Sequence, residues 1–224
     1  MTDQPENAIL LSGLDRDYGD RPALAGVDLD LPAGSSLAVL GPNGSGKSTL
    51  LRILATLLRP SRGEVSVLGC RLPSEAWKLR GRIGYLGHEP LLYEDLTGRE
   101  NLEFQARLYG LKPDVAATRI ENDLELLGMT RRANYRVSDY SAGMKQRIAI
   151  CRAVLHRPAL LLLDDPDSNL DPDGRQAARA LIGLPGELGW ESDVPVTRVA
   201  VSHEPEKARA EADHVLELRI GVGA

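Results

Sequence analysis

Residues 36–54 read SLAVLGPNGSGKSTLLRIL, and this stretch decides the fold. Residues 36–40 are apolar and short, which is typical of a buried strand. A glycine-rich segment follows, and from Leu50 onward leucine and isoleucine recur at helical spacing as far as Leu58. The stretch therefore predicts a strand, a glycine loop and a helix in that order.

The segment from Gly41 to Ser48 matches the pattern G-x-x-x-x-G-K-S/T in this strand-to-helix context. Glycines let backbone N–H groups turn inward around phosphate oxygens, and the helix N-terminus adds positive potential. Lys47 would place its charge near the β and γ phosphates, and the Ser48 hydroxyl would bind Mg²⁺. The alternative is a flexible glycine turn, but a chance match is expected in on the order of one per cent of chains of this length. The candidate nucleotide-binding residues are Gly41, Pro42, Asn43, Gly44, Ser45, Gly46, Lys47, Ser48 and Thr49.

The rest of the chain alternates between strand and helix patterns. Strands are expected at 8–14, 27–31, 65–68, 83–86, 159–163, 199–201 and 215–218, and helices over 74–79, within 97–128, after Ser141 and over 175–184. This alternation predicts an α/β protein with a mostly parallel sheet covered on both faces. The first two strands would form an antiparallel edge, and 97–128 would form a helical insertion.

Composition narrows the class of protein. The chain has 224 residues, of which 42% are hydrophobic and 26% charged, as in a globular protein with a substantial core. A net charge of −5 gives no overall basic field, so no nucleic-acid partner is expected. The longest apolar run, 159–163, is far shorter than the roughly 20 residues of a membrane span, and residues 1–7 lack a signal-peptide pattern. We expect a cytoplasmic protein whose Cys70 and Cys151 are buried or inert thiols.

Two carboxylates follow the apolar run at the end of an expected strand. Asp164 and Asp165 lie where the strands of an α/β sheet present ligands. Asp164 would hold Mg²⁺ through water, and Asp165 would orient the attacking water. An apolar strand that ends in aspartate is common in proteins. The catalytic interpretation of Asp164 and Asp165 therefore depends on the glycine loop in the same chain.

The segment YSAGMKQR, which runs from Tyr140 to Arg147, resembles the signature sequence of ATP-binding-cassette (ABC) ATPases, Leu-Ser-Gly-Gly-Gln in its usual form. It lies 23 residues before Asp164, counted from Ser141, as that family requires. Ser141 is also a plain helix cap for the N–H groups of Gly143 and Met144. The resemblance implies that Ser141, Ala142, Gly143 and Met144 bind the γ-phosphate held by a second subunit.

Three further segments are similar to motifs of the same family. Residues 168–171 resemble its D-loop, His203 resembles its switch histidine, and Tyr18 matches the aromatic residue that stacks on adenine. A lone histidine or tyrosine is otherwise more often structural. The resemblance runs from Ala8 to Leu218 and implies a P-loop NTPase fold that uses ATP and Mg²⁺.

The resemblance also implies partners. Two such chains, as a homodimer or a paired cassette, would sandwich two ATP molecules. Separate membrane subunits would dock near the segment from His88 to Asp95, where Leu91, Leu92 and Tyr93 are either exposed or local core. The chain would then lie at the inner face of the cell membrane.

The chain departs from the family pattern at three places. Asp165 stands where the family usually has glutamate, so the carboxylate is one methylene shorter. His88 stands where the family usually has glutamine, and as a candidate catalytic and metal-binding residue it can still accept through one nitrogen. Ala142 and Met144 replace glycine and glutamine. Together with the sequence LGHEP at 86–90, they make the chain similar to the haem-exporter ATPases of cytochrome c maturation.

We therefore predict one ABC ATPase domain over 1–224, with a core of 1–87 and 146–224 and a helical subdomain at 88–145. The expected function is ATP hydrolysis that powers transport, with export favoured and haem export the leading guess. Two alternatives stay open. One is a nucleotide-gated regulatory switch with weak hydrolysis, which Asp165 favours. The other is a soluble cassette ATPase of translation or DNA repair, against which stand the single cassette and the lack of a heptad tract.

Overall fold

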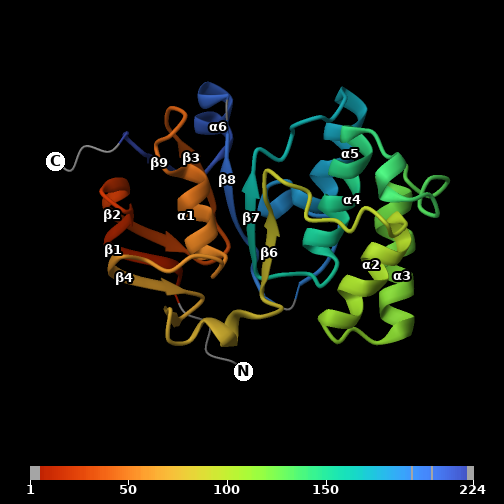
Figure 1. The fold of residues 1–224 in the computed structure, drawn as a ribbon, viewed down its shortest axis with the longest axis horizontal. Helices are drawn as coiled ribbons and strands as arrows, with labels where there is room; N and C mark the ends of the chain where they lie inside the picture. The colour runs from red at the N-terminus through yellow and green to blue at the C-terminus, as the bar shows by residue number, and fades with distance from the viewer. Residues whose placement is uncertain (1–5, 193, 203, 221–224) are drawn as a thin grey trace.

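The computed structural model describes residues 6–192, 194–202 and 204–220, and its strands lie in two sheets (Figure 1). One sheet is parallel throughout, in the order β6 (Ile83–Leu86), β7 (Leu160–Asp164), β8 (Thr197–Val201), β3 (Ser36–Leu40) and β9 (His214–Glu217). The other is antiparallel, in the order β2 (Arg21–Pro32), β1 (Asn7–Tyr18), β4 (Arg62–Val67) and β5 (Cys70–Leu72). The predicted fold class is thereby confirmed.

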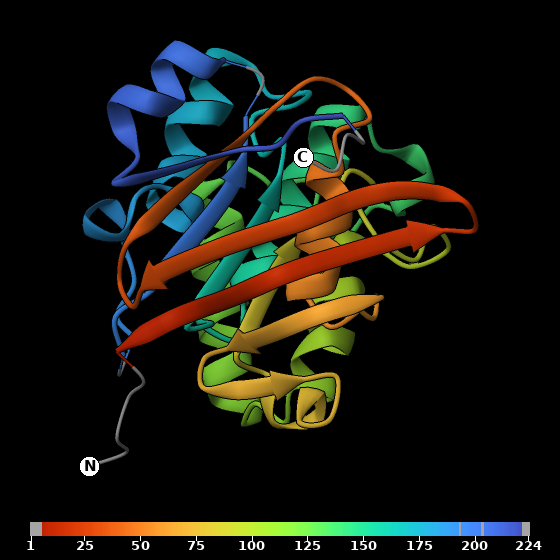
Figure 2. The ribbon, with the colours of Figure 1, turned by 90° about the vertical axis from the view of Figure 1, so that its left-hand side faces the viewer.

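Helices cover both faces of the parallel sheet. Helix α1 (Lys47–Leu54) lies between the two sheets, and Figure 2 shows β1, β2 and β4 crossing in front of it. On the opposite face lie α4 (Ala142–Val154) and α5 (Pro172–Ile182), with α2 (Gly98–Leu108) and α3 (Pro113–Leu126) beyond them. The short helix α6 (Pro205–Glu211) precedes β9. Single 3₁₀ turns occur at Ala76–Leu79, Val137–Asp139 and Pro185–Glu187.

The leucine run of β7 explains this layering. Leu160 and Leu162 pack into the cluster that contains α1, whereas Leu161 and Leu163 pack into the cluster with α4 and α5. Successive strand residues point to opposite faces, so a continuous apolar run is what a strand covered on both sides requires.

Several element bounds differ from those predicted. Strands β3 and β6 have the predicted limits, but β1 and β2 are longer than expected, and β5 and α6 were not predicted. Helix α1 ends at Leu54 instead of continuing to Leu58, because Thr56 adopts a left-handed φ of 63° and breaks the helix. The expected helix over 74–79 is only the 3₁₀ turn at Ala76–Leu79. The division at 87/88 and 145/146 stays a prediction.

The described residues include no helix that is both long and apolar enough to span a bilayer. Both cysteines are buried and free, and burial raises the pKa of the Cys151 thiol well above its usual range. This agrees with the expected inert thiols.

Candidate nucleotide site

The parallel strands bring most of the sequence-predicted site residues to one edge. Their carboxyl ends lie on the same side of the sheet, so the loops after β3, β6, β7 and β8 meet there. In register, Val39 is opposite Val201, and Val201 is opposite Asp164. His203, predicted as the switch histidine, lies outside the described residues.

The glycine loop joins β3 to the first turn of α1, which contains Lys47, Ser48 and Thr49. Lys47 is only 7% exposed, and its Nζ donates hydrogen bonds to the carbonyl oxygens of Gly41 (2.7 Å) and Pro42 (2.9 Å). Among the described residues it has no carboxylate within ion-pair distance. A buried ammonium held on neutral carbonyls carries an uncompensated positive charge.

The backbone at position 46 explains why this residue is glycine. Its φ is 91°, and a Cβ placed on it would lie 2.2 Å from the carbonyl oxygen of Ala23 and 2.7 Å from a Leu24 methyl carbon. The loop is therefore pressed against β2, and only glycine fits this left-handed, crowded position.

The loop fits a polyphosphate by three features. The N-cap of α1 is Gly46, which has no side chain to accept a hydrogen bond from the first N–H groups of the helix. The Ser45 hydroxyl is buried and has no hydrogen-bond partner among the residues described. Together with the Lys47 charge, these donors favour an anion with several oxygens.

The two aspartates end β7 differently. Asp164 is the last strand residue and is 7% exposed, whereas Asp165 is half-buried in a left-handed conformation with φ of 52°. No cluster of three or more His, Cys, Asp or Glu side chains in the described ranges could hold a metal by itself. The Ser48 hydroxyl and Asp164 would instead share Mg²⁺ with phosphate oxygens and water, which suits an ion that keeps several waters. His88 is exposed after β6 at the same edge.

The signature segment forms the start of α4. Ser141 is the N-cap, and its hydroxyl accepts a hydrogen bond from the N–H of Met144 at 3.3 Å, as predicted. Ala142, Gly143 and Met144 make up the first turn. In Figure 1, α1 and α4 lie on opposite sides of β6 and β7. One chain therefore separates its glycine loop from its signature segment.

Contacts between α4 and the loop after β7 were not foreseen from the sequence. Gln146 is buried and its amide donates to the carbonyl oxygen of Pro166 at 3.1 Å. Arg147 pairs with Asp171 at 2.6 Å, and this hydrogen bond holds the pKa of the Asp171 carboxyl below its usual range. A Cβ on Gly143 would lie 2.7 Å from the Asn169 carbonyl oxygen. The motifs alone do not predict these contacts, because the contacts join segments about 20 residues apart in the sequence.

Tyr18 lies at the end of β1, opposite Arg21 in the turn of the β1–β2 hairpin, and is 47% exposed. Further along β2, Ala23 and Leu24 touch Gly46 of the loop. Tyr18 thus stands at the end of the hairpin that borders the glycine loop.

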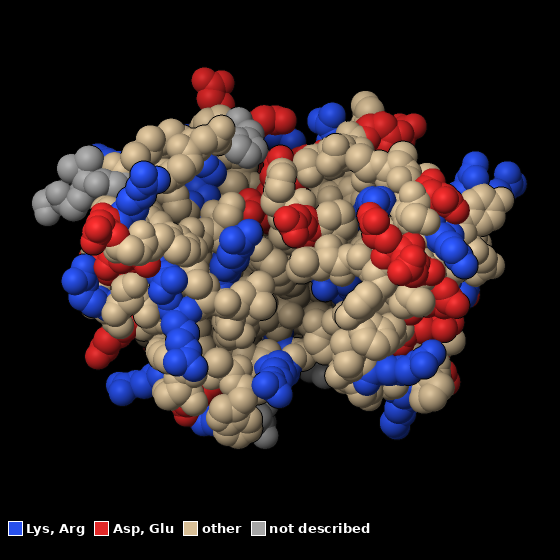
Figure 3. Space-filling view, in the orientation of Figure 1, with Lys and Arg blue, Asp and Glu red and all other residues tan. Residues whose placement is uncertain are grey.

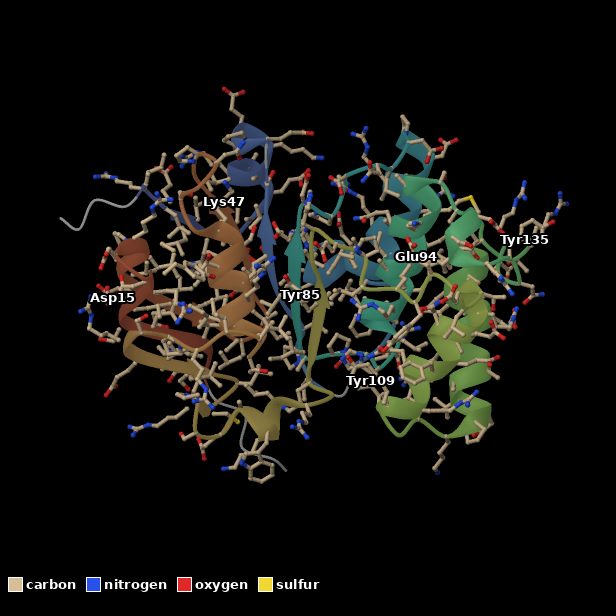
Figure 4. All side chains as sticks on the ribbon, viewed as in Figure 1. Asp15, Lys47, Tyr85, Glu94, Tyr109 and Tyr135 are labelled. Atoms are coloured by element: carbon tan, nitrogen blue, oxygen red, sulfur yellow. The ribbon has the colours of Figure 1, made fainter. Side chains whose placement is uncertain are left out.

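A groove of about 440 Å³ separates α1 and β6 from α2 and α4. It appears as a hollow near the centre of the face in Figure 3, and Tyr85 and Tyr109, which line it, are labelled in Figure 4. Exposed Leu57, Leu91 and Leu108 also line it. Of the three residues expected near the dock, Leu91 is exposed, Tyr93 is exposed and edge-on to Phe104, and Leu92 packs on the core.

Fold and site together define the class: an ATP-binding cassette with a P-loop nucleotide fold. The domain family described as ABC transporter matches residues 24–168, and the chain belongs to this family. It is 29% identical to the dimeric structure of the bacterial ABC transporter cassette MJ0796, with a TM-score of 0.82 and 95% of each chain covered. The same cassette is also known in a post-hydrolysis state with ADP and Pi, with a TM-score of 0.79 and 28% identity, covering 96% of this chain and 97% of that one.

Curated relatives of the chain are named as ATP-binding proteins. The chain is 41% identical over 182 residues to the daunorubicin resistance ATP-binding protein DrrA3 of Streptomyces coeruleorubidus, covering 80% of this chain and 58% of that protein. It is 35% identical to the ABC transporter ATP-binding protein NatA of Bacillus subtilis, covering 95% and 86%. The chain thus spans little more than half the length of several curated relatives. These relatives do not support the predicted haem-exporter subfamily. That prediction depended on a few single-residue variants such as His88, and the similarity over most of the chain is to other transporters.

Proposed function

We propose that this chain binds and hydrolyses ATP as the nucleotide-binding subunit of an ABC exporter. The observation that carries the proposal is the buried, carboxylate-free Lys47 ammonium beside the uncapped start of α1. In this proposal the residues from Gly41 to Thr49 hold the phosphates, and Tyr18 stacks on adenine.

The residues proposed to act in hydrolysis follow the carboxyl ends of the parallel strands. Mg²⁺, when bound, neutralises charge on the β and γ phosphates. Ser48 and Asp164 would hold it, and His88, in the loop after β6 at the same edge of the sheet, would contribute a nitrogen. Asp165 would accept a hydrogen bond from the attacking water and orient it in line, and His203 would hold the same water against the γ-phosphate.

A second copy completes the site in this proposal. Ser141 to Met144 form the positive end of α4, which favours an anion, but they lie away from their own glycine loop. An antiparallel pair of chains would bring the signature of each over the loop of the other, and the similar cassette MJ0796, whose structure is dimeric, supports a site made by two chains.

We propose that the groove is where a membrane subunit docks, next to the segment from His88 to Asp95. Exposed leucines on both walls favour an amphipathic helix of the partner. This would hold the chain at the inner face of the cell membrane. Among substrates, a drug or antibiotic moved outward is favoured, because relatives are named for daunorubicin and linearmycin resistance.

The decisive test of nucleotide binding is Lys47→Ala. Removing the only cationic side chain of the segment from Gly41 to Thr49 should weaken Mg·ATP affinity at least a hundredfold, measured by calorimetry. Lys78→Ala is the matched control, since Lys78 pairs with Glu75 on the surface and should bind ATP normally. Retention of ATP affinity within threefold in the Lys47 variant would reject the assignment.

Docking is tested separately by placing a charge on the groove wall. Leu108→Glu should abolish co-purification of the membrane subunit and leave ATP binding intact. Leu126→Glu is the control, because Leu126 is likewise exposed but does not line the groove. Equal recovery of the membrane subunit with both variants would place the dock elsewhere.

The short side chain of Asp165 supports one other function. The chain would then be a nucleotide-gated switch that dimerises with ATP but hydrolyses it slowly. Steady-state hydrolysis measured beside ATP-induced dimerisation separates it from a transport engine. Dimerisation with ATP but without measurable turnover would favour the switch.

A further inference from the structure

The end of β1 beside the glycine loop is held in place by the segment that follows α1. The N–H of Ser61 donates to the Asp15 carbonyl at 2.9 Å, and the N–H of Asp17 donates to the Ser61 hydroxyl at 3.0 Å. Arg62 forms ion pairs with both Asp15 and Asp17. The backbone that carries Tyr18 is therefore fixed on one side.

These contacts between the end of β1 and residues 59–62 also place the Arg16 side chain against Tyr18. Its Cζ lies 4.8 Å from the centre of the Tyr18 ring, and its Nη1 donates to the Arg59 carbonyl at 3.3 Å. Its Nε is buried and has no hydrogen-bond partner in the part of the chain that is described. No ion pair of Arg16 occurs there either, so the ring and one carbonyl set the place of the guanidinium.

One face of the Tyr18 ring is thus covered by a planar cation. The ring is still 47% exposed, and it stands at the hairpin end next to the glycine loop, with Arg16 opposite Leu24, which touches Gly46. A guanidinium stacks well on an aromatic face and limits how the ring can rotate. The uncovered face is then presented in a fixed orientation.

We propose that Arg16 is a positioning residue for the nucleotide base: it backs Tyr18, so that guanidinium, phenol ring and adenine form a continuous stack. This rests on the proposed ATP site and deepens it, because it assigns base affinity to a residue that does not touch the nucleotide. Holding the ring in advance removes the loss of rotamer freedom that binding would otherwise cause.

The test compares Mg·ATP with Mg·tripolyphosphate, which has the phosphates but no base. Arg16→Ala should raise the Kd for ATP about two- to fivefold and leave the Kd for tripolyphosphate unchanged. Arg59→Ala removes a nearby exposed charge but keeps the carbonyl that Arg16 uses, and should bind both ligands normally. Arg16→Lys keeps the charge without the planar fork and should also lose ATP affinity selectively.

A double-mutant cycle isolates the stack. In a Tyr18→Ala background, Arg16→Ala should have no further effect on ATP affinity. Unchanged ATP affinity in Arg16→Ala, an equal loss for both ligands, an equal loss in Arg59→Ala, or an undiminished effect without Tyr18 would each overturn the proposal. Failure of the wild-type chain to bind tripolyphosphate would instead overturn the proposed ATP site.

Discussion

Asp165 adopts a backbone conformation that aspartate and asparagine tolerate better than most residues, with φ of 52°. This gives a local reason for a short acidic side chain after β7. It also makes asparagine a well-matched substitution, because asparagine keeps the size and the backbone preference and removes only the charge.

We predict that Asp165→Asn binds Mg·ATP within about twofold of wild type but hydrolyses it at least a hundredfold more slowly, as expected for loss of a positioned base. Asp165→Glu should hydrolyse faster, up to about tenfold, because the carboxylate reaches one methylene further. The same change should lower the free energy of unfolding by about 1 kcal/mol because of the left-handed backbone. Single-turnover rates and urea unfolding give both readouts, and wild-type turnover in Asp165→Asn would remove Asp165 from the mechanism.

His156 is a buried titratable residue outside the nucleotide site. It stacks on Tyr109 with ring centres 3.8 Å apart, and its Nε2 lies 3.0 Å from the Ile83 carbonyl oxygen. Burial lowers the pKa of this histidine from 6.5 to about 4. The folded chain therefore holds His156 neutral, and the unfolded chain binds a proton more readily.

The sign of the pH effect follows from that shift. The stabilisation is fully present above pH 6.5 and is lost as the pH falls from 6.5 toward 4, by about 2 kcal/mol between pH 7.5 and pH 5. His156→Phe keeps a ring against Tyr109 but binds no proton. Urea unfolding at both pH values should show a smaller loss of stability in the variant by about 2 kcal/mol, and equal losses would contradict the assignment.

At the scale of elements, the segment from His88 to Asp95, where we propose that the membrane subunit docks, is joined directly to α4. Lys145 of α4 lies 2.5 Å from Glu94, which is labelled in Figure 4, and the Ser138 N–H donates to the Glu94 carbonyl at 3.0 Å. Because Glu94 is 65% exposed, the ion pair should add under about 1 kcal/mol to stability. Its effect should therefore be on coupling and not on folding.

We predict that Lys145→Glu lowers ATP hydrolysis stimulated by the membrane subunits several-fold in the assembled transporter, while ATP affinity and thermal stability stay near wild type. The exchanged pair, Glu94→Lys with Lys145→Glu, should restore most of the stimulation. A double variant no better than the single one would show that this ion pair carries no coupling.

Elements with strong patterns were predictable, and those set by tertiary contacts were not. The apolar runs of β3 and β6 gave the correct bounds, and the Ser141 cap gave the start of α4. The last residues of β1 are polar, so they form a strand only because they pair with β2 and β4. Helix α6 buries no residue and so shows no apolar stripe. In the site, the residue types were predictable from motifs, but the Arg16 hydrogen bond to the Arg59 carbonyl and the Gln146 hydrogen bond join segments that are distant in the sequence.

At the scale of the whole molecule, the layers separate the two halves of the site. The glycine loop lies at the start of α1 between the sheets, and the signature lies at the start of α4 beyond the parallel sheet (Figure 1). The proposed ATPase therefore requires two chains. Each ATP would lie between the glycine loop of one chain and the signature segment of the other.

The most direct test of that claim is the mass of Asp165→Asn in sedimentation with and without Mg·ATP. The account predicts a monomer of 24.3 kDa without nucleotide and twice that mass with Mg·ATP, because hydrolysis no longer releases the partner. Adding Ser141→Arg, which blocks the signature without touching the glycine loop, should return the ATP-bound chain to a monomer. An Asp165→Asn chain that binds Mg·ATP and stays monomeric, or dimerises equally well with Ser141→Arg, would contradict the two-chain site.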